Sequence, residues 1–364
     1  MSGTSMDGVD AVLASFDPLG KPQVVERSDA PFTRSLRDEF LALNRAGSDE
    51  LARSALAANT LAEVYAQAVK QLLVKSKVNA CEIRAIGAHG QTVRHQPDQG
   101  YTIQLNAPAY LAELTGITVI ADFRSRDIAA GGQGAPLVPM FHAGVFASTN
   151  TRAVLNLGGI ANVTVLIPGD NPIGFDTGPA NVLMDLWCEM HTGAPYDHDG
   201  KWGMSGEIHA ELLAHLINSE PWFALNAPKS TGRDLFHRSW LESRIDYVKN
   251  LHGGQTPFRP QDIQATLRAL TAQSASDAIA KYAAGAADVL ICGGGARNAA
   301  LMNELQRRIP CPVQPTDFAG IGTQDVEALA FAWLAWAHQQ GIAVGNPSVT
   351  GARGARILGA TWPA

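Results

Sequence analysis

The stretch from residue 153 to residue 185 constrains the fold of this chain more than any other. It reads AVLNLGGIANVTVLIPGDNPIGFDTGPANVLMD. Ala153–Leu157 has the length and the apolar composition of a buried strand, and Gly158-Gly159 interrupts it. Val163–Ile167 predicts a second strand, so the two strands and the glycine turn indicate a β-hairpin.

The second half of this stretch predicts an acid at the end of a strand. Ile173–Phe175 leads directly into Asp176, and Pro179 suits the first turn of a helix that we expect from about Ala180 to Met190. The glycine turn offers free backbone N–H groups, and the acid can act on a proton or a cation. Enzymes that handle phosphate groups use both features.

Composition limits the class of protein. The 364 residues correspond to about two domains, and 46% hydrophobic residues are enough for a sizeable core. Only 17% of the residues are charged, the net charge is -6, and no basic run suggests a nucleic-acid or anionic-membrane partner. The sequence shows neither an 18-residue apolar span nor a signal peptide. Because the four cysteines form no CxxC pair and no metal-binding spacing, we expect a reduced cytoplasmic protein with these cysteines in its core or strands: Cys81, Cys188, Cys292 and Cys311.

Strands and helices are expected to alternate along the chain. Helices are expected at 49–75, 108–115, 260–284, 299–308 and 326–339, and strands at 9–16, 85–87, 118–122, 288–292 and 356–362. Each half begins with a strand, a glycine turn and a second strand. We interpret this pattern as an internal duplication of an α/β unit.

Two glycine turns occupy corresponding places in the two halves. Gly3–Asp10 (GTSMDGVD) offers backbone amides, two hydroxyls and two acids that could hold Mg²⁺ through water, although an ordinary β-turn is the better explanation when the stretch is taken alone. It is not a Walker A loop, because no Gly-Lys-Ser/Thr follows. Asn156–Gly159 is the second candidate phosphate turn, or simply a hairpin turn. Because the two turns occupy matching positions, the interpretation that both bind phosphate is favoured more than it is for either turn alone.

A third glycine turn ends the strand expected at 288–292. Gly293–Gly295 precedes a helix that begins near Asn298. Three consecutive glycines let a nucleotide base or ribose pack flat against the backbone. A close strand–helix turn explains them equally well, and both interpretations remain open.

Asp176 allows three interpretations. Asp-Thr-Gly also occurs in aspartic proteases, but these need two such carboxylates and no second copy exists here. The second interpretation is a lone general base at a strand end, and the third is a helix-capping Asp.

Further polar residues follow other predicted strands. His89 and Gln91 lie in AHGQT after one strand, and Arg124 and Arg126 follow another. Glu327 begins an apolar helix, where it either complements the helix dipole or accepts a hydroxyl. A structural histidine and surface ion pairs are the alternatives for His89 and the arginines.

Eight motifs together span nearly the whole sequence. They are GTSMDGVD, AIGAHGQTVRH, ADFRSRDIAAGGQGAPLVP, LNLGGIANVT, GFDTGPANVLMD, PKSTGR, ICGGGARN and PSVTGA. In type and order they resemble those of the anhydro-N-acetylmuramic acid kinases, a family of the sugar kinase/Hsp70/actin superfamily.

The resemblance implies an α/β fold with two ribonuclease-H-like domains around a central ATP cleft. We expect the first domain at 1–127 plus 345–364 and the second at 128–344. The implied ligands are ATP, Mg²⁺ and an anhydro sugar, without nucleic acid or membrane, and a homodimer stays open as an assembly.

The resemblance also implies roles for individual positions. Asp176 matches the catalytic aspartate. The ATP-binding positions are Gly3, Thr4, Ser5, Met6, Asp7, Gly8, Val9, Asp10, Asn156, Gly158, Gly159, Gly293, Gly294, Gly295 and Asn298. The substrate-binding positions are His89, Gln91, Arg126 and Glu327.

The chain departs from the family pattern at three places. About ten residues usually precede GTS and form the first strand, whereas Met1-Ser2 alone precede it here. We therefore expect either that the first strand is missing or that the start lies upstream. Ala180 replaces a commoner glycine, and Ser125 replaces an arginine.

The implied reaction opens a 1,6-anhydro ring during phosphoryl transfer. Asp176 would take a proton from the water that attacks C1, and O6 would take the γ-phosphoryl group of ATP, giving N-acetylmuramate 6-phosphate and ADP. Two alternatives are a sister kinase for another anhydro sugar such as levoglucosan and a catalytically idle ATP-gated clamp of the actin/Hsp70 kind.

Overall fold

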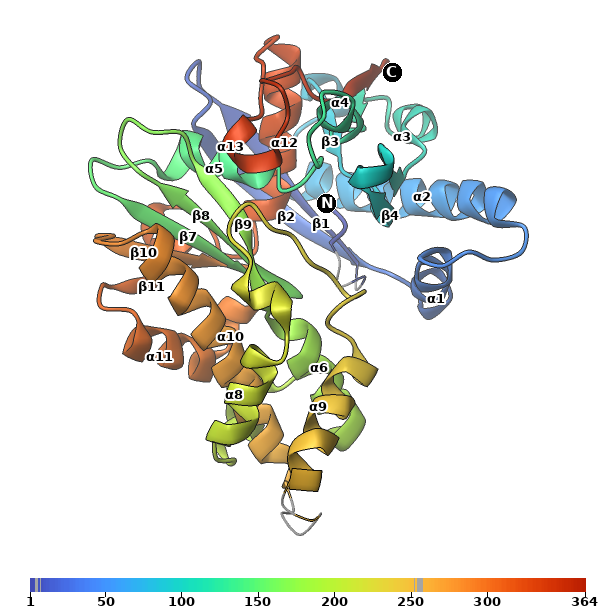
Figure 1. Ribbon diagram of the computed structural model, residues 1–364. Coiled ribbons are helices and arrows are strands. Elements are labelled where there is room, and N and C mark those ends of the chain that lie inside the picture. Colours follow the sequence, from blue (N-terminus) through green and yellow to red (C-terminus); the bar gives the residue numbers. More distant parts are fainter. Residues whose placement is uncertain (4–5, 7, 252, 254–257) are drawn as a thin grey trace. The chain divides into compact units, whose positions relative to one another are not determined.

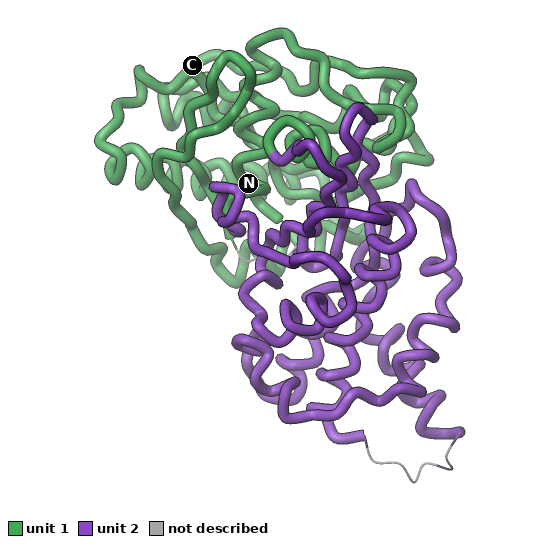
Figure 2. The backbone as a smooth tube through the Cα atoms, turned by 90° about the vertical axis from the view of Figure 1, so that its left-hand side faces the viewer, with its two compact units in different colours: residues 1–145, 325–364 green, residues 146–324 purple. Residues whose placement is uncertain are grey.

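The computed structural model describes residues 1–3, 6, 8–251, 253 and 258–364 (Figure 1). The chain divides into two compact units (Figure 2). Unit 1 comprises Met1–Val145 and Asp325–Ala364, and unit 2 comprises Phe146–Gln324. These limits differ from the expected 1–127 plus 345–364 and 128–344, because α12 (Val326–Gln339) packs on the strands of unit 1.

Unit 2 contains a five-stranded sheet with a characteristic order. The strands lie in the order β11 (Val313–Pro315), β10 (Asp288–Cys292), β7 (Arg152–Leu157), β8 (Ile160–Leu166) and β9 (Ile173–Pro179). β8 is antiparallel to both β7 and β9, whereas β10 and β11 run parallel to β7. Read in the opposite direction, from β9 to β11, these are the third, second, first, fourth and fifth strands of the unit in chain order. This is the order expected of a ribonuclease-H-like domain.

The sequence explains why the centre of this sheet is buried. β7 and β10 read RAVLNL and DVLIC, which are nearly continuous apolar runs of the kind found where helices cover both faces of a sheet. α10 (Pro260–Tyr282) packs on β8 and β9, and its first helical residue is a proline whose fixed φ suits that position. α6 (Asn181–Thr192) and α8 (Ala210–Asn218) pack against α10.

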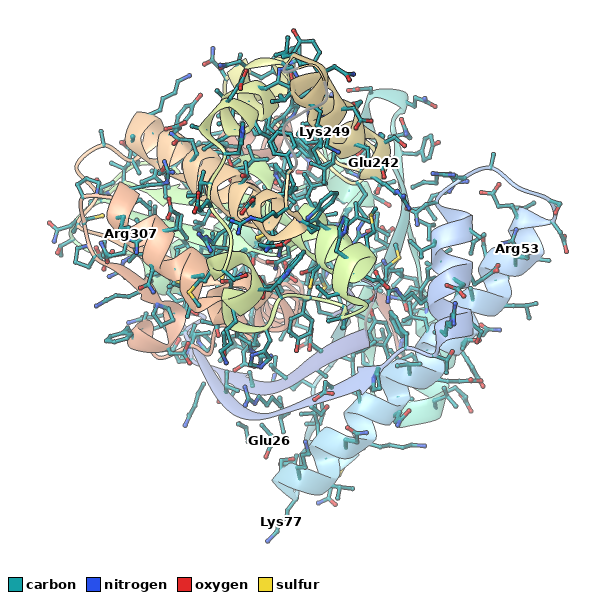
Figure 3. The ribbon with its side chains drawn as sticks, turned by 90° about the horizontal axis from the view of Figure 1, so that it is seen from below. Glu26, Arg53, Lys77, Glu242, Lys249 and Arg307 are labelled. Atoms are coloured by element: carbon teal, nitrogen blue, oxygen red, sulfur yellow. The ribbon has the colours of Figure 1, made fainter. Side chains whose placement is uncertain are left out.

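Charged residues lie on the outer sides of the helices. α9 (Arg238–Leu251) buries Trp240, Leu241, Ile245 and Val248. Glu242 and Lys249 of the same helix, labelled in Figure 3, have side chains that are 40% and 42% exposed. This one-sided pattern is typical of a helix that covers a core.

Unit 1 contains several short sheets. β1 (Gly8–Phe16) pairs antiparallel with β2 (Pro22–Pro31). A separate sheet has the order β12 (Ala360–Trp362), β6 (Val119–Ala121), β3 (Ile86–Ala88). β4 (Gln91–Gln96) and β5 (Tyr101–Leu105) form a hairpin. α2 (Glu50–Ser76) packs on β1 and β2, and α12 packs on β1 and β3. The other α-helices are α1 (Arg34–Leu43), α3 (Pro108–Thr115), α4 (Ser125–Ala129), α5 (Val138–Phe146), α7 (Lys201–Met204), α11 (Ala299–Arg308) and α13 (Pro347–Thr350).

One expectation around the central stretch is wrong. Pro179 is the last residue of β9 and not part of the first helical turn, and α6 begins only at Asn181 after the N-cap residue Ala180. Asp176 therefore lies within a strand and caps no helix.

The cysteines also differ from the expectation. Cys188 and Cys292 are buried and Cys311 is partly buried, but Cys81 is exposed in the 3₁₀ turn Ala80–Glu82. In the described part of the chain, no helix combines the length and the apolar character that crossing a membrane requires.

Candidate active site

Asp176 belongs to a row of polar residues across the sheet of unit 2. In β9 it lies opposite Asn162 of β8, and Asn156 of β7 lies opposite the same asparagine. Residues directly opposite each other on antiparallel strands share a face of the sheet. Sequence reasoning missed Asn162, although an asparagine inside the otherwise apolar run IANVTVL was a usable signal.

The segment from Lys229 to Thr231 runs beside Asp176. The Thr231 N–H donates to Asp176 Oδ2 at 2.9 Å, and the Asp176 N–H donates to the Lys229 carbonyl at 3.0 Å. Burial raises the pKa of Asp176 to about 7, while the Thr231 N–H and the Lys229 charge oppose that rise. The carboxyl group therefore titrates close to neutral pH, where a general base is most effective.

Trp222 and Lys229 hold this segment in place. Lys229 Nζ donates to the Phe223 carbonyl at 3.0 Å and lies 4.2 Å from the centre of the Trp222 ring. The Trp222 indole N–H in turn donates to the Ser230 carbonyl at 2.9 Å. In the sequence, PKSTGR was only one of the family motifs, and its place beside Asp176 depends on tertiary structure.

The two glycine turns predicted in unit 2 lie together. β7 and β10 are parallel neighbours, so their carboxyl ends meet at one edge of the sheet. A Cβ atom at Gly293, where φ is +82°, would lie less than 3 Å from Asn156 Oδ1. One at Gly295 would lie 2.6 Å from the Leu157 Cβ. Both glycines are therefore needed for the close packing of the two turns.

Two other glycines of these turns have no close neighbour at the place where a Cβ atom would lie. A Cβ at Gly158 would have no neighbouring atom nearer than 3.6 Å, and one at the exposed Gly294 none nearer than 3.7 Å. A phosphate group or a ribose can therefore approach the backbone here, and this cradle fits the nucleotide that the motifs imply. Asn181 supports it by donating from Nδ2 to the Leu157 carbonyl at 3.0 Å. The Asn298 side chain accepts the Leu301 N–H at 3.0 Å and so caps α11, directly after the Gly293–Gly295 turn.

The first predicted phosphate loop is partly strand. Gly8, Val9 and Asp10 already belong to β1, and the side chains of Val9 and Met6 are buried in the core of unit 1. At Gly8 a Cβ would lie 2.6 Å from the Ala30 carbonyl oxygen, so the glycine permits the close pairing with β2. Gly3 is the first residue of the loop, and Thr4, Ser5 and Asp7 lie outside the described residues. A ligand at this end of β1 would meet backbone and not the Val9 or Met6 side chain.

His89 is a buried, neutral residue with two polar contacts in unit 1. Its Nε2 accepts from Arg124 Nη2 at 2.9 Å, so the proton sits on Nδ1, which donates to the Ser2 carbonyl at 3.2 Å. Burial and the Arg124 charge hold the pKa of His89 well below its usual range. Gln91 is buried beside it and hydrogen-bonds Ser2 through its Oε1. His89 and Gln91 therefore connect the end of β3 to the residues before β1.

Arg124, rather than Arg126, joins this cluster. Arg124 Nη1 also donates to the Gly134 carbonyl at 2.7 Å, whereas Arg126 is exposed on α4. Burial lowers the pKa of Arg124 to about 10, and the negative charge of Glu327 partly opposes this. Glu327 of α12 is thus an electrostatic neighbour of Arg124.

Among the residues that the structure describes, no three His, Cys, Asp or Glu side chains are grouped so as to hold a metal ion. Magnesium that accompanies a nucleotide needs only one or two carboxylates, because phosphate oxygens and water complete its ligands.

The comparisons with known proteins cover the whole chain. The profile of the anhydro-N-acetylmuramic acid kinase family matches residues 1–364. An anhydro-N-acetylmuramic acid kinase of Bordetella pertussis is 61% identical over 364 residues, which cover 100% of this chain and 95% of the relative. One from Chromobacterium violaceum is 50% identical over 367 residues, covering 100% and 98%.

The similar solved structures include a protein of low sequence identity. The activator of 2-hydroxyisocaproyl-CoA dehydratase from Clostridium difficile, with bound ADPNP, is 13% identical with a TM-score of 0.44, and the match covers 92% of this chain and 96% of that one.

Proposed function

The chain belongs to the anhydro-N-acetylmuramic acid kinase family, and from this premise we propose how its residues carry out the reaction. It is an ATP-dependent kinase that acts on 1,6-anhydro-N-acetylmuramic acid, a sugar of cell-wall recycling. The match over the full length of the chain carries this conclusion. Because the reaction consumes ATP, we place it in the cytoplasm.

The chemistry requires a base, because the substrate has no free 6-hydroxyl group. O6 is locked in an ether to C1, so water attacks C1 while the C1–O6 bond breaks. The electron pair of that bond stays on O6, which bonds to the γ-phosphorus as the bond to ADP breaks. The water loses one proton, and we assign its acceptance to Asp176. The products are N-acetylmuramate 6-phosphate and ADP.

The surroundings of Asp176 suit this role. With a pKa of about 7, the group is a carboxylate in mildly alkaline solution and a stronger base than an ordinary aspartate. The Thr231 N–H holds Oδ2 and leaves Oδ1 for the water. Aspartic-protease chemistry lacks support, because it needs a second carboxylate that shares the proton.

The open glycine turns are the proposed nucleotide site in unit 2. Gly158, Gly159 and Gly294 would supply backbone N–H groups to ATP, with Asn156 and Asn181 holding the turns in place. Mg²⁺ bound to ATP would neutralise charge on the phosphate groups.

The sugar-side assignments rest on the family motifs. His89, Gln91 and Glu327 remain the proposed substrate-binding residues, and Arg126 is proposed because its exposed guanidinium is available to an anion. Arg124 is added as a positioning residue, since His89 and Gly134 already occupy its donors. Of the first phosphate loop, Gly3 and Gly8 are kept as backbone donors.

A coupled assay for ADP release with 1,6-anhydro-N-acetylmuramic acid tests the activity. Turnover with this sugar, and little with levoglucosan, is expected because levoglucosan lacks the lactyl carboxylate. ATP binding without sugar-stimulated turnover would favour the idle clamp instead. The same reaction in ¹⁸O-water should place the label on C1 of the product sugar and none in its phosphate group, whereas label in phosphate would indicate simple ATP hydrolysis.

A further inference from the structure

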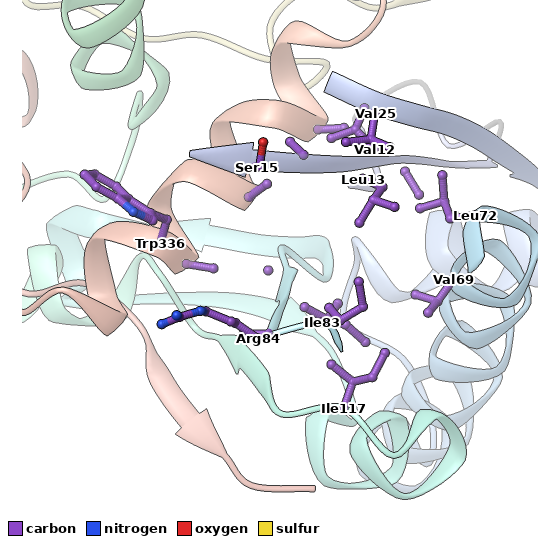
Figure 4. A pocket seen from close by; sticks show the side chains of 18 of the residues that line it. Val12, Leu13, Ser15, Val25, Val69, Leu72, Ile83, Arg84, Ile117 and Trp336 are labelled. Carbon is purple, nitrogen blue, oxygen red and sulfur yellow. The ribbon is translucent and has the colours of Figure 1, made fainter. Parts of the chain in front are cut away.

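A cavity in unit 1 and a cavity in unit 2 differ in size and in the side chains that line them. The first has a volume of about 800 Å³ and lies beside β1, and Figure 4 shows Val12 of β1, Ile83 and Ile117 on its walls. The second has a volume of about 380 Å³, and its lining includes two lysines, Lys229 and Lys281. Protein pockets of about 300 Å³ and more hold small molecules, so the cavity in unit 2 is large enough for a compact ligand.

The cavity in unit 2 lies behind the strand that carries Asp176. β9 contributes Phe175 and Thr177, the residues on either side of Asp176, and the 3₁₀ turn Pro221–Ala224 contributes Phe223. Asp176 is not part of the lining, because neighbouring residues of a strand point to opposite faces. One face of α10 forms another wall, with residues at the three- and four-residue spacing of neighbours on a helix: Ser274, Asp277, Ala278, Lys281 and Tyr282.

In the described part of the chain, the hydrogen bonds of both lysine ammonium groups go to neutral oxygens. Lys229 Nζ donates to the Phe223 carbonyl at 3.0 Å and to the Trp222 carbonyl at 3.4 Å. Lys281 Nζ donates to Asn226 Oδ1 at 2.6 Å. An ammonium group has three N–H donors, so each lysine keeps at least one for a further acceptor. Burial and the charge of Lys281 lower the pKa of Lys229, so the two positive charges repel each other across this cavity.

The carboxylates that line this cavity are engaged by other side chains. Glu220 Oε2 accepts from Trp240 Nε1 at 2.8 Å and from Arg244 Nη2 at 3.0 Å. Asp277 Oδ1 accepts from Gln273 Nε2 at 2.7 Å. An anion that enters the cavity would therefore meet positive charge that no described carboxylate pairs with.

We propose that the cavity in unit 2 is a regulatory site for a small monocarboxylate with an apolar body. The carboxylate of the ligand would accept from Lys229 and Lys281, whose charges it would neutralise. The apolar body would pack against Phe175, Phe223 and Ala278.

Lys229 connects this site with Asp176. The positive charge of Lys229 lowers the pKa of the Asp176 carboxyl group, against the burial that raises it. A bound carboxylate would offset that positive charge, so Asp176 would be protonated at higher pH and the reaction would slow near neutral pH. This effect on the rate rests on the proposed role of Asp176 as the base, whereas binding itself does not.

Isothermal titration calorimetry at pH 7 tests binding with phenylacetate, and phenylacetamide is the neutral probe of the same shape. Phenylacetate should bind at least about tenfold more tightly than phenylacetamide. Lys281→Met should weaken phenylacetate binding at least about fivefold. Lys249→Met removes a lysine of α9 outside the cavity and should leave binding unchanged. Ala278→Phe places a ring in the cavity and should abolish binding.

Equal affinities for the two probes, or phenylacetate binding that is undiminished in Lys281→Met or Ala278→Phe, would refute the site. If Ala278→Phe does not fold, the neutral probe and Lys281→Met still decide. With phenylacetate at saturation, kcat/KM should fall about twofold at pH 7 and be unchanged at pH 9. An unchanged pH profile of the bound protein would refute the effect on Asp176. Because calorimetry needs no turnover, a failure of the proposed kinase activity is distinguished from a failure of the site.

Discussion

Asp176→Asn keeps the shape of the side chain and its acceptor for the Thr231 N–H, but the amide accepts no proton from water. General bases contribute about 10²- to 10⁴-fold to rate, and the upper end is expected because no other base lies in the row Asn156–Asn162–Asp176. ATP binding, followed by calorimetry, should be unchanged because the glycine turns are untouched. Near-normal turnover of this variant would remove Asp176 from the mechanism.

The raised pKa of Asp176 predicts opposite effects of pH on activity and stability. kcat/KM should fall about tenfold per pH unit below pH 7 as the base is protonated. Folding disfavours the carboxylate, so the wild-type protein carries a stability penalty that is full above pH 7 and disappears below about pH 4. Asp176→Asn should therefore melt higher than wild type at pH 8 and at the same temperature near pH 4. Equal melting temperatures at pH 8 would contradict a pKa near 7.

At the scale of elements, the segment around Lys229 predicts control of the Asp176 pKa. The positive charge of Lys229 lowers that pKa, and its hydrogen bond to Phe223 holds the segment beside β9. Lys229→Met should therefore move the pH profile of kcat/KM to higher pH and reduce the rate at pH 7 by about two- to fivefold. Lys281→Met is the matched control, because Lys281 bonds Asn226 and lies over Tyr282 instead. A Lys229→Met rate loss without any shift of the pH profile would indicate a structural role alone.

The paired glycine turns predict a contrast between neighbouring substitutions. Gly293→Ala forces a positive φ on alanine and drives its Cβ into Asn156, at a cost of about 1–3 kcal/mol in stability, with a raised KM for ATP. The Cβ of Gly294→Ala makes only an ordinary contact, 3.7 Å from Asn181 Nδ2, so stability should stay within about 0.5 kcal/mol of wild type. Chemical denaturation measures both. Equal losses for the two variants would mean that the close packing of the turns is unimportant.

Elements with signals at both ends were predicted closely from sequence. The limits of α3, α11, α12 and β10 agree with the expected 108–115, 299–308, 326–339 and 288–292. The predicted end of β9 was too early, because Pro179 has no N–H to donate to a neighbouring strand. β9 is an edge strand, where a missing donor is tolerated. β2 was missed because the only adjacent large apolar residues in PQVVERSDAP are Val24 and Val25.

The candidate site was predictable only in part. Asp176 and each glycine turn could be recognised from local sequence signals. Their functional roles remain predictions. The Arg124–His89 contact, the position of Thr231 beside Asp176 and the row through Asn162 join residues far apart in sequence. Tertiary contacts of this kind leave no periodicity or spacing to read in a single chain.

At the scale of the whole molecule, the two units differ in how the chain builds them. Unit 2 is one continuous segment with its own hydrophobic core, including Leu155, Phe175 and Leu267. Unit 1 needs residues from both ends of the chain, since α12 packs on β1 and β3. The isolated segment 146–324 should therefore fold and melt cooperatively. A chain ending at residue 324 should leave unit 1 unfolded; a native-like unit 1 signal from it, or a non-cooperative melt of 146–324, would contradict this division.

The exposed position of Cys81 makes unit 1 accessible to spectroscopy without engineering. Cys188 and Cys292 are buried, and burial raises the pKa of the half-buried Cys311 thiol, which lowers its share of reactive thiolate. A maleimide dye should thus label Cys81 first in the native protein. Since Glu82 and Ile83 next to it line the cavity beside β1, the fluorescence of such a dye would report local changes at that wall in real time.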